Sequence, residues 1–209
     1  MSKGILYFVL LITLLSNTNT EVSNEISLDS NQSLASGVFT ESEFQIQNKT
    51  KDVTVKIGDT REEVERKLGN YVDYYAHTNV YEYRNNVSIH YKTGIVDGIM
   101  IYDTAMNPRK FKTPRGIGYG STYQDVIHQY GRKAFMDSKK GKVTSITYAF
   151  EKNKQGQYNT ITSFDHLVLE GGYENVKILS MAFDQKGRLS FMMIAEHEFA
   201  YHPEWNHIE

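Results

Sequence analysis

Two stretches decide the fold: residues 57–69, IGDTREEVERKLG, and residues 118–131, GYGSTYQDVIHQYG. Aligned without gaps, each contains a threonine, a valine four positions later, a large apolar residue after another four, and then a glycine. The alignment sets Thr60, Val64, Leu68 and Gly69 against Thr122, Val126, Tyr130 and Gly131. Repetition of such a pattern predicts two copies of one structural unit.

Each stretch predicts a short helix with its own start and stop. Asp59 or Thr60 would cap the first-turn amides, and Glu63 lies three residues after Thr60, as a capping box requires. The valine and leucine that follow are four residues apart and therefore share one helical face. Gly69 would end the helix in a left-handed conformation. The second stretch repeats these features, so we expect two helices of two to three turns.

Strand patterns follow each predicted helix. Alternating apolar and polar residues, separated by turns that contain asparagine or glycine, indicate antiparallel hairpins. In the first copy the expected strands are 80–84, 87–92 and 95–102. In the second copy they are 142–151, 158–169, 176–183 and 188–194.

These elements predict an α+β fold of two tandem units, each with short helices packed on an antiparallel meander sheet. The two sheets either remain separate or fuse into one, with the helices on one side. Residues that face the helices should be apolar, as Val87 and Ile89 are. The residues between them would then point outward, toward solvent.

The helix pattern Ile-Gly-x-Thr-x-x-x-Val-x-x-x-Leu-Gly, followed by tyrosine-rich strands, resembles the SmpA/OmlA (BamE-like) and beta-lactamase-inhibitor-protein-like families. The resemblance covers residues 53–196 and is looser in the second copy, where Gly118 and Tyr119 interrupt the pattern. It implies a secreted or envelope protein that binds other proteins through an open sheet face. The chain lacks the anchoring cysteine of the lipoproteins and the cysteine pairs of the inhibitor. The resemblance therefore transfers no inhibitory residue to this sequence.

The composition narrows the class of partner. The chain has 209 residues, of which 40% are hydrophobic, enough for a substantial core. Its formal net charge is -2, whereas a nucleic-acid-binding surface is basic, so we expect no nucleic-acid partner. The absence of cysteine excludes disulfides, thiolate metal sites and a cysteine nucleophile. The sequence offers neither a nucleophile elbow nor a phosphate-binding loop, so we expect no enzyme and no cofactor.

The N-terminus predicts export. Lys3 precedes the apolar run ILYFVLLITLL at residues 5–15, and residues 16–20 are polar. This order is typical of a secretory signal, and the run is short for a membrane span, which needs roughly 20 residues. An uncleaved anchor and a buried helix are the alternatives. We expect a secreted or cell-envelope protein without a stable membrane span after processing.

The rest of the chain divides by composition. Residues 21–50 are polar and predict a flexible lead, whose second half would add a short strand or cap to the folded part. We expect the first unit at 51–105, the second at 106–196 and a C-terminal tail at 197–209, after the signal at 1–20.

The tail contains the densest polar cluster, with three histidines and three glutamates between residues 196 and 207. His197-Glu198 begins like a metalloprotease helix, but the next histidine, His202, is five residues on instead of four, and Pro203 would end the helix. We expect a solvated tail in which Tyr201 and Trp205 pack back on the folded part. Metal binding at these histidines remains the alternative.

The candidate binding surface is the outward face of the predicted sheet. Alternation places polar and aromatic residues there: Glu82, Arg84, Ser88, His90, Lys92 and Tyr102 in the first copy, and Ser145, Thr147, Ser180 and Ala182 in the second. Tyrosine combines a large contact area with a polar tip, which suits an interface. We select Arg84, His90, Lys92 and Tyr102 as partner-binding residues, against the alternative of an ordinary solvated face. Tyr71, Tyr74 and Tyr75 would form either a core edge or a contact loop.

Three functions fit this sequence. The first is an exported, non-enzymatic protein-binding module or inhibitor that acts through the open sheet face. The second is a glycan or small-ligand binding protein of the cell envelope. The third is a metal-dependent enzyme that uses the C-terminal histidines. The oligomeric state and the identity of the protein partner stay open.

Overall fold

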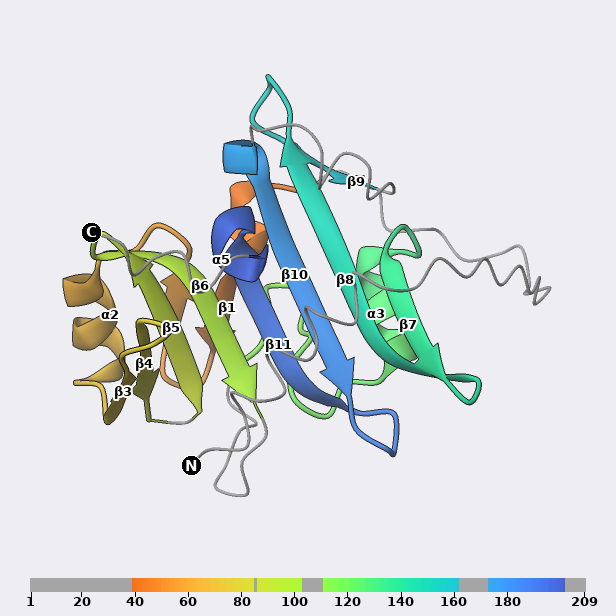
Figure 1. Ribbon diagram of the computed structural model, residues 1–209, viewed down its shortest axis with the longest axis horizontal. Coiled ribbons are helices and arrows are strands. Elements are labelled where there is room, and N and C mark those ends of the chain that lie inside the picture. The colour runs from red at the N-terminus through yellow and green to blue at the C-terminus, as the bar shows by residue number, and fades with distance from the viewer. Residues whose placement is uncertain (1–38, 85, 103–110, 162–172, 202–209) are drawn as a thin grey trace. The chain divides into compact units, whose positions relative to one another are not determined.

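The computed structural model describes residues 39–84, 86–102, 111–161 and 173–201 (Figure 1). The chain divides into residues Met1–Leu34 and Ala35–Glu209, and all the described residues belong to the second of these units. The predicted signal at 1–20 and the histidines at 202 and 207 lie outside the described residues.

One large antiparallel sheet organises the described residues. Its strands follow the order β3-β4-β5-β6-β11-β10-β8-β7, and β9 pairs with β8. Their bounds are β3 (Asp73–Tyr75), β4 (Val80–Tyr83), β5 (Val87–Lys92), β6 (Ile95–Tyr102), β7 (Phe135–Lys139), β8 (Lys142–Lys152), β9 (Tyr158–Ile161), β10 (Val176–Phe183) and β11 (Leu189–Glu196). Strands from both halves of the sequence therefore share one sheet, joined where β6 pairs with β11.

The two predicted helices are confirmed as α2 (Arg61–Leu68) and α3 (Tyr123–Tyr130). In α2 the Glu63 amide donates to Thr60 Oγ1 at 3.2 Å, and the Thr60 amide donates to Glu63 Oε2 at 2.8 Å. Asp125 and Thr122 make the same reciprocal pair at α3. Both helices stop at a glycine with a positive φ, as predicted.

The segment before each helix is tied to the sheet by the same pair of hydrogen bonds. The Gly58 amide donates to Val96 O at 2.8 Å, and the Val96 amide donates to Asp59 O at 2.8 Å. Before α3, the Gly120 amide donates to Leu189 O at 3.0 Å, and the Leu189 amide donates to Ser121 O at 2.7 Å. Each helix therefore begins beside the last strand of its own hairpin.

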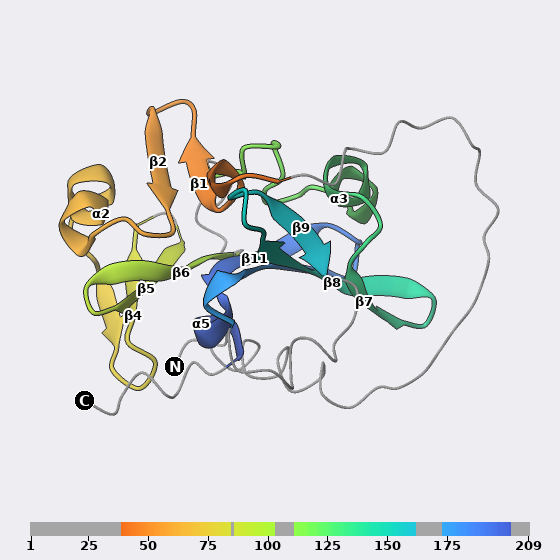
Figure 2. The same ribbon diagram turned by 90° about the horizontal axis from the view of Figure 1, so that it is seen from above.

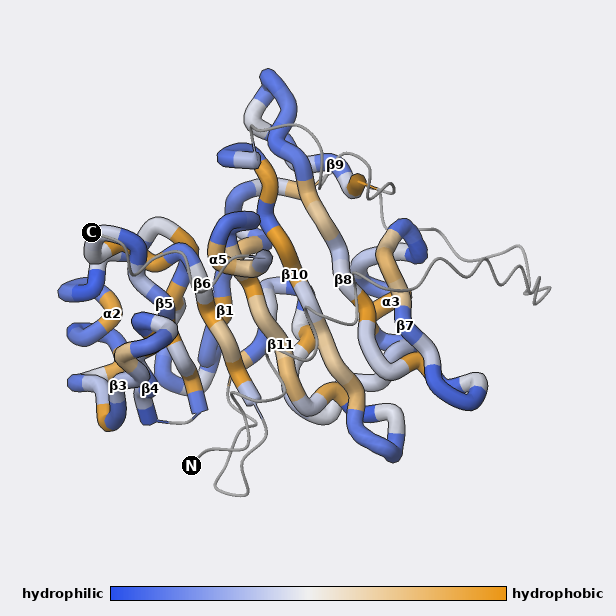
Figure 3. The backbone as a smooth tube through the Cα atoms, in the orientation of Figure 1, coloured by the Kyte–Doolittle hydropathy of each residue, from blue (hydrophilic) through white to orange (hydrophobic). Residues whose placement is uncertain are grey.

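The core lies between the sheet and the elements on its helical face. Figure 2 shows α2, α3 and the small hairpin of β1 (Gln45–Asn48) and β2 (Val53–Lys56) on one side of the sheet, and α5 (His197–Tyr201) on the other. Val64 and Val126 from the two helices are fully buried, as are Val87 and Ile89 from β5. Figure 3 shows hydrophobic residues along the central strands and hydrophilic residues at the hairpin tips.

The second half of the predicted polar lead contributes a short strand to the folded part, as expected for it. The short 3-10 helix η1 (Glu41–Glu43) and β1 both lie within it, and Phe39 and Phe44 are 1% and 2% exposed. Phe39 exchanges two backbone hydrogen bonds with Tyr158, at 3.0 and 2.8 Å. The few apolar residues of the lead therefore close the core over the second half of the chain.

An ion-pair cluster holds this segment in place. Lys177 Nζ donates to Glu41 Oε1 at 2.6 Å and to Glu196 Oε1 at 3.0 Å, and Tyr158 donates its hydroxyl to Glu41 at 2.7 Å. Burial opposes ionisation of Glu41, but the hydrogen bonds from Lys177 and Tyr158 outweigh it and lower the pKa of this carboxyl. Glu41 therefore stays ionised and accepts the hydrogen bonds of Lys177 and Tyr158.

The sheet face opposite the helices was predicted to be exposed to solvent. This prediction is wrong for five of its residues. They are 0–4% exposed: Ser88, His90, Ser145, Thr147 and Ser180. Thr147 and Ser180 join their hydroxyls across neighbouring strands at 3.0 Å. Part of the reason is α5, which contacts β6, β10 and β11 and buries Phe199 completely. Residues 197–201 are thus a packed helix instead of the solvated tail that the sequence predicts.

Candidate functional site

The four predicted partner-binding residues do not form one surface. Arg84 and Lys92 are exposed, and Lys92 forms a salt bridge with Glu198 of α5. Tyr102 is half-buried, and its hydroxyl hydrogen bonds with Ser88. His90 is fully buried, so it cannot contact a partner. The prediction that His90 points to solvent is wrong because α5 covers it.

His90 belongs to the docking site of α5. Its Nδ1 lies 2.5 Å from Asp97 Oδ1, and its ring stacks on Phe199 with centroids 4.2 Å apart. Phe199 reaches this position because Gly98 has no side chain: a Cβ there would lie 2.3 Å from the Phe199 ring. His90, Asp97, Gly98 and Phe199 therefore anchor a helix and form no accessible site.

A different surface carries exposed aromatic side chains. At the outer edge of the sheet, Tyr71 is 41% exposed, Val72 55% and Tyr74 42%. They lie just before or within β3, the terminal strand, beside Arg61 at the start of α2 and Tyr81 of β4. We call the set of Arg61, Tyr71, Val72, Tyr74 and Tyr81 the aromatic edge.

The rings of the aromatic edge hold one another in place. The Tyr81 ring lies at the centre, with centroid distances of 5.1 Å to Tyr71 and 4.5 Å to Tyr74. The Arg61 guanidinium lies 4.3 Å from the Tyr81 centroid and 5.1 Å from that of Tyr71. Aromatic pairs and cation–π contacts of this kind each contribute roughly 0.5–1.5 kcal/mol. The side chains of the aromatic edge are therefore held in position by contacts within the chain.

The aromatic edge continues into the core through buried tyrosines. The Tyr81 ring contacts that of Tyr91 at 5.3 Å, and the hydroxyls of Tyr91 and Tyr83 are 2.7 Å apart. Burial raises the pKa of Tyr91 and of Tyr83, and it also raises that of Tyr81. These phenols stay neutral, so they anchor the exposed rings without adding charge.

Arg61 remains charged in this setting. Its Nε donates to Glu65 Oε1 at 2.9 Å, one helical turn along. This hydrogen bond raises the pKa of the Arg61 guanidinium against the opposing effect of burial. The aromatic edge therefore combines neutral rings with one fixed cation.

The opposite edge of the sheet has different chemistry. There Met136 of β7 is 47% exposed, and the Tyr123 hydroxyl donates to its sulfur at 3.3 Å. Asp137 and Lys139 follow on the same strand, and a bulge between Asp137 and Ser138 interrupts the pairing. Charges and bulges at an edge strand discourage association with another chain.

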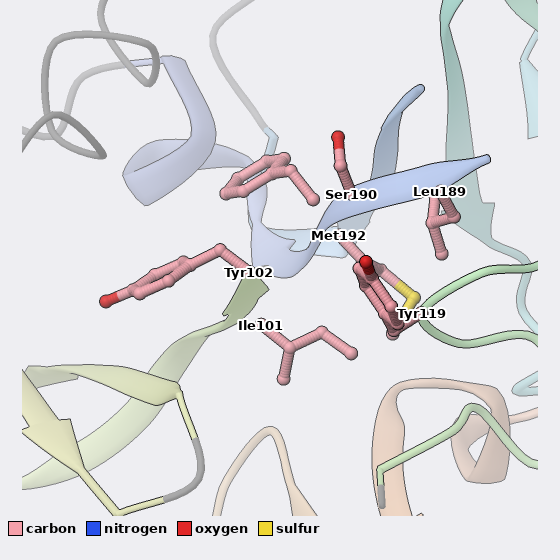
Figure 4. Close-up of a pocket in the computed structure, with 7 residues that line it drawn as sticks. Ile101, Tyr102, Tyr119, Leu189, Ser190 and Met192 are labelled. Atoms are coloured by element: carbon pink, nitrogen blue, oxygen red, sulfur yellow. The ribbon is translucent and has the colours of Figure 1, made fainter. Parts of the chain in front are cut away.

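A small pocket opens at the junction of β6 and β11. Figure 4 shows its lining, formed by Ile101, Tyr102, Tyr119, Leu189, Ser190, Phe191 and Met192. The Tyr102 side chain points away from Tyr119 and Leu189 in this view. The lining carries the hydroxyls of Tyr102, Tyr119 and Ser190 and is otherwise apolar.

The hypothesis of a metal site at the C-terminal histidines finds no geometric support in the described part of the chain. No three histidine, aspartate or glutamate side chains there lie close enough together to hold a metal ion. His197 is buried and stacks on Tyr173 and Tyr201, with centroid distances of 4.1 and 4.7 Å. Within the described ranges, no helix is long and apolar enough to cross a membrane.

Comparison with known proteins adds no assignment. No protein-family model matches the chain, and no curated protein and no solved structure matches it. The resemblance to the BamE-like and inhibitor-like families therefore stays a prediction.

The sequence indicated only part of the aromatic edge. Of the three tyrosines weighed as core edge or contact loop, Tyr71 and Tyr74 are exposed, whereas Tyr75 is half-buried and donates its hydroxyl to Glu82 at 2.7 Å. The sequence pattern does not single out Arg61, Val72 or Tyr81 as contact residues. The signal in the sequence is the run YVDYY at residues 71–75, which gathers four large apolar or aromatic side chains outside the strands that the alternation predicts.

Proposed function

We propose that this chain is an exported, non-enzymatic protein-binding module whose contact surface is the aromatic edge. One observation carries the proposal: the exposed rings of Tyr71 and Tyr74 both pack on Tyr81, next to the Arg61 guanidinium, and Val72 between them in the sequence is exposed as well. Tyrosine and arginine dominate the residues that contribute most to protein–protein binding. This moves the predicted binding surface from the sheet face, where His90 and Ser88 are buried, to the sheet edge.

The physical advantage of the aromatic edge is its low ordering cost. Binding usually immobilises side chains at about 0.5–1.5 kcal/mol each. Here the Tyr71 and Tyr74 rings already pack on Tyr81, and Tyr81 packs on the buried Tyr91. A partner would meet side chains that have lost much of their freedom before it arrives.

We infer that the fold consists of two tandem units related by an approximate two-fold axis. The order β3-β4-β5-β6 in one half mirrors β7-β8-β10-β11 in the other. Val96 and Leu189 make equivalent hydrogen bonds before α2 and α3. Four residues beyond each lie Met100 and Met193, which pair with each other across β6 and β11. Equivalent residues that meet in this way support a two-fold relation.

A comparison of the two units shows whether the fold requires the tyrosines of the aromatic edge. In the gap-free alignment, Arg61 corresponds to Tyr123, Tyr71 to Lys133, and Tyr74 to Met136. The second unit forms its helix and its edge strand without the exposed tyrosines of the first. The fold itself therefore does not require them.

Export remains part of the proposal because the basic start, the apolar run at 5–15 and the polar exit form a signal pattern. A secreted or envelope location would bring the aromatic edge into contact with extracytoplasmic proteins. A glycan partner is the second hypothesis, and the same experiment addresses it.

The test is a pull-down with the purified chain against secreted and surface fractions of the source organism. We expect one protein to be retained by the wild type and by the control Met136→Ala, and its recovery to fall at least about tenfold with Tyr71→Ala/Tyr74→Ala, in keeping with two lost hot-spot residues. The midpoint of urea unfolding checks that each variant is folded.

Equal recovery with the double variant would overturn the aromatic edge as the contact surface. Retention of a polysaccharide in place of a protein, with the same dependence on Tyr71 and Tyr74, would favour the glycan hypothesis.

A further inference from the structure

Arg61 has hydrogen-bonding capacity that the described part of the chain leaves unused. A guanidinium presents five N–H donors in a planar fork. Only Nε has an acceptor among the described residues, the Glu65 carboxylate at 2.9 Å, and the side chain is 38% exposed. The two terminal nitrogens, which form the bidentate end of the fork, make no hydrogen bond to any described residue.

The plane of the fork is held in position. The guanidinium lies over the Tyr81 ring at 4.3 Å and close to the Tyr71 ring at 5.1 Å, and Glu65 holds it from a third side. An arginine held this way loses little further freedom when it binds a planar anion. Its charge-assisted, bidentate bonds to a carboxylate are among the strong hydrogen bonds of proteins.

The acidic side chains of β3 and β4, Asp73 and Glu82, pair with each other next to the Tyr74–Tyr81 pair, so they lie on the other face of the sheet from the two tyrosines. Asp73 Oδ1 accepts from the Tyr74 amide at 2.8 Å, and Glu82 Oε2 accepts from the Tyr75 hydroxyl at 2.7 Å. Among the described residues, the salt bridge of Arg61 is with Glu65.

The start of the helix does not by itself require a charged side chain. At the equivalent place in the second unit, Tyr123 starts the helix, contacts the ring of Phe183 at 6.2 Å and donates to Met136. A neutral side chain therefore serves the helix start and covers the edge. The fold therefore accepts a neutral residue here, and Arg61 adds to it the contacts with Tyr71 and Tyr81 and the ion pair with Glu65.

We propose that Arg61 binds a carboxylate side chain of the protein partner, alongside an apolar or aromatic side chain that packs on Tyr71 and Tyr74. The inference rests on the proposed function, since it names the partner chemistry of the same surface. The partner segment would carry an aspartate or glutamate next to a large apolar residue.

The test selects peptides from a random phage-displayed library against the folded chain. We expect wild-type selections to be enriched in segments that combine an acidic with an aromatic or apolar residue. With Arg61→Gln the acidic preference should disappear while the apolar preference stays. The affinity of a selected peptide should fall about 10- to 100-fold, the range of a lost charge-assisted pair.

The matched control is Arg66→Gln, which removes the same charge from an exposed position on the same helix and should keep the acidic preference. Arg61→Lys keeps the charge but loses the fork, so it should recover only part of the affinity. Urea unfolding midpoints confirm that all three variants are folded.

The outcomes separate this inference from the proposed function. Peptides that need Tyr71 and Tyr74 but show no acidic preference, or keep it in Arg61→Gln, overturn the role of Arg61 and leave the protein-binding surface in place. Peptides that bind regardless of Tyr71 and Tyr74 overturn both.

Discussion

Gly98 shows how one residue determines the packing of a helix. A Cβ at this position would lie 2.3 and 2.5 Å from two Phe199 ring atoms and 3.2 Å from the His90 Cβ. Glycine to alanine in a strand normally gains about 0.5–1 kcal/mol. Here the overlap with a buried ring outweighs this gain, so we expect Gly98→Ala to destabilise the fold by about 1–3 kcal/mol in urea unfolding.

A second variant identifies the cause of this loss. In Gly98→Ala/Phe199→Ala the clashing ring is absent, so the double variant should cost less than the two single costs together. Additive costs would show that Gly98 matters for another reason than its contact with Phe199.

At the scale of elements, the two helix caps are equivalent. Thr60 and Thr122 each accept from the third helical amide at 3.2 Å, and each helix is eight residues long. We expect Thr60→Ala and Thr122→Ala to lower the free energy of unfolding by similar amounts, about 1 kcal/mol each. A loss confined to one helix would contradict their equivalence. Urea denaturation of both variants provides the comparison.

The caps also predict an acid dependence. The hydrogen bond from the Thr60 amide lowers the pKa of Glu63, and that from Thr122 lowers the pKa of Asp125. A carboxyl whose pKa is lowered by folding stabilises the fold above its unfolded pKa, and this contribution disappears as pH falls through the folded pKa. We expect the urea midpoint of unfolding to decrease as the pH is lowered below about 5. The decrease should be less steep in Glu63→Gln/Asp125→Asn. An unchanged slope would contradict this prediction.

At the scale of the whole molecule, one sheet joins the two halves. Strands β6 and β11 pair from Gly98 and Ala195 to Tyr102 and Phe191, in the middle of the strand order. Separating the halves would expose this edge and the apolar residues beside it. We therefore expect a single cooperative unfolding transition, with far-ultraviolet circular dichroism and tyrosine fluorescence changing together.

Fragments test the same point from the other direction. We expect residues 39–105 and 106–201 to be unfolded alone and to gain strand signal when mixed. Native circular dichroism of either fragment by itself would contradict the dependence on the β6–β11 pairing.

The helices and most hairpins were predictable because their signals are local. The caps, the apolar spacing and the glycine stops all lie within the segment that they shape. The edge strands β3 and β7 were missed because they are three and five residues long and lack clear alternation. The aromatic edge was only partly seen, because exposure of Tyr71 and Tyr74 depends on the absence of a further strand beyond β3.

Local patterns of residues specify the two capped helices, the meanders that follow them and the apolar face that includes Val87 and Ile89. The joining of both meanders into one sheet and the burial of His90 by α5 depend on contacts between distant segments. The physical reason is the separation along the chain between the residues that interact. A cap or a strand pattern is encoded by neighbours, whereas burial depends on which distant segment arrives: Phe199 reaches His90 across more than a hundred residues of chain, through the space that Gly98 leaves empty.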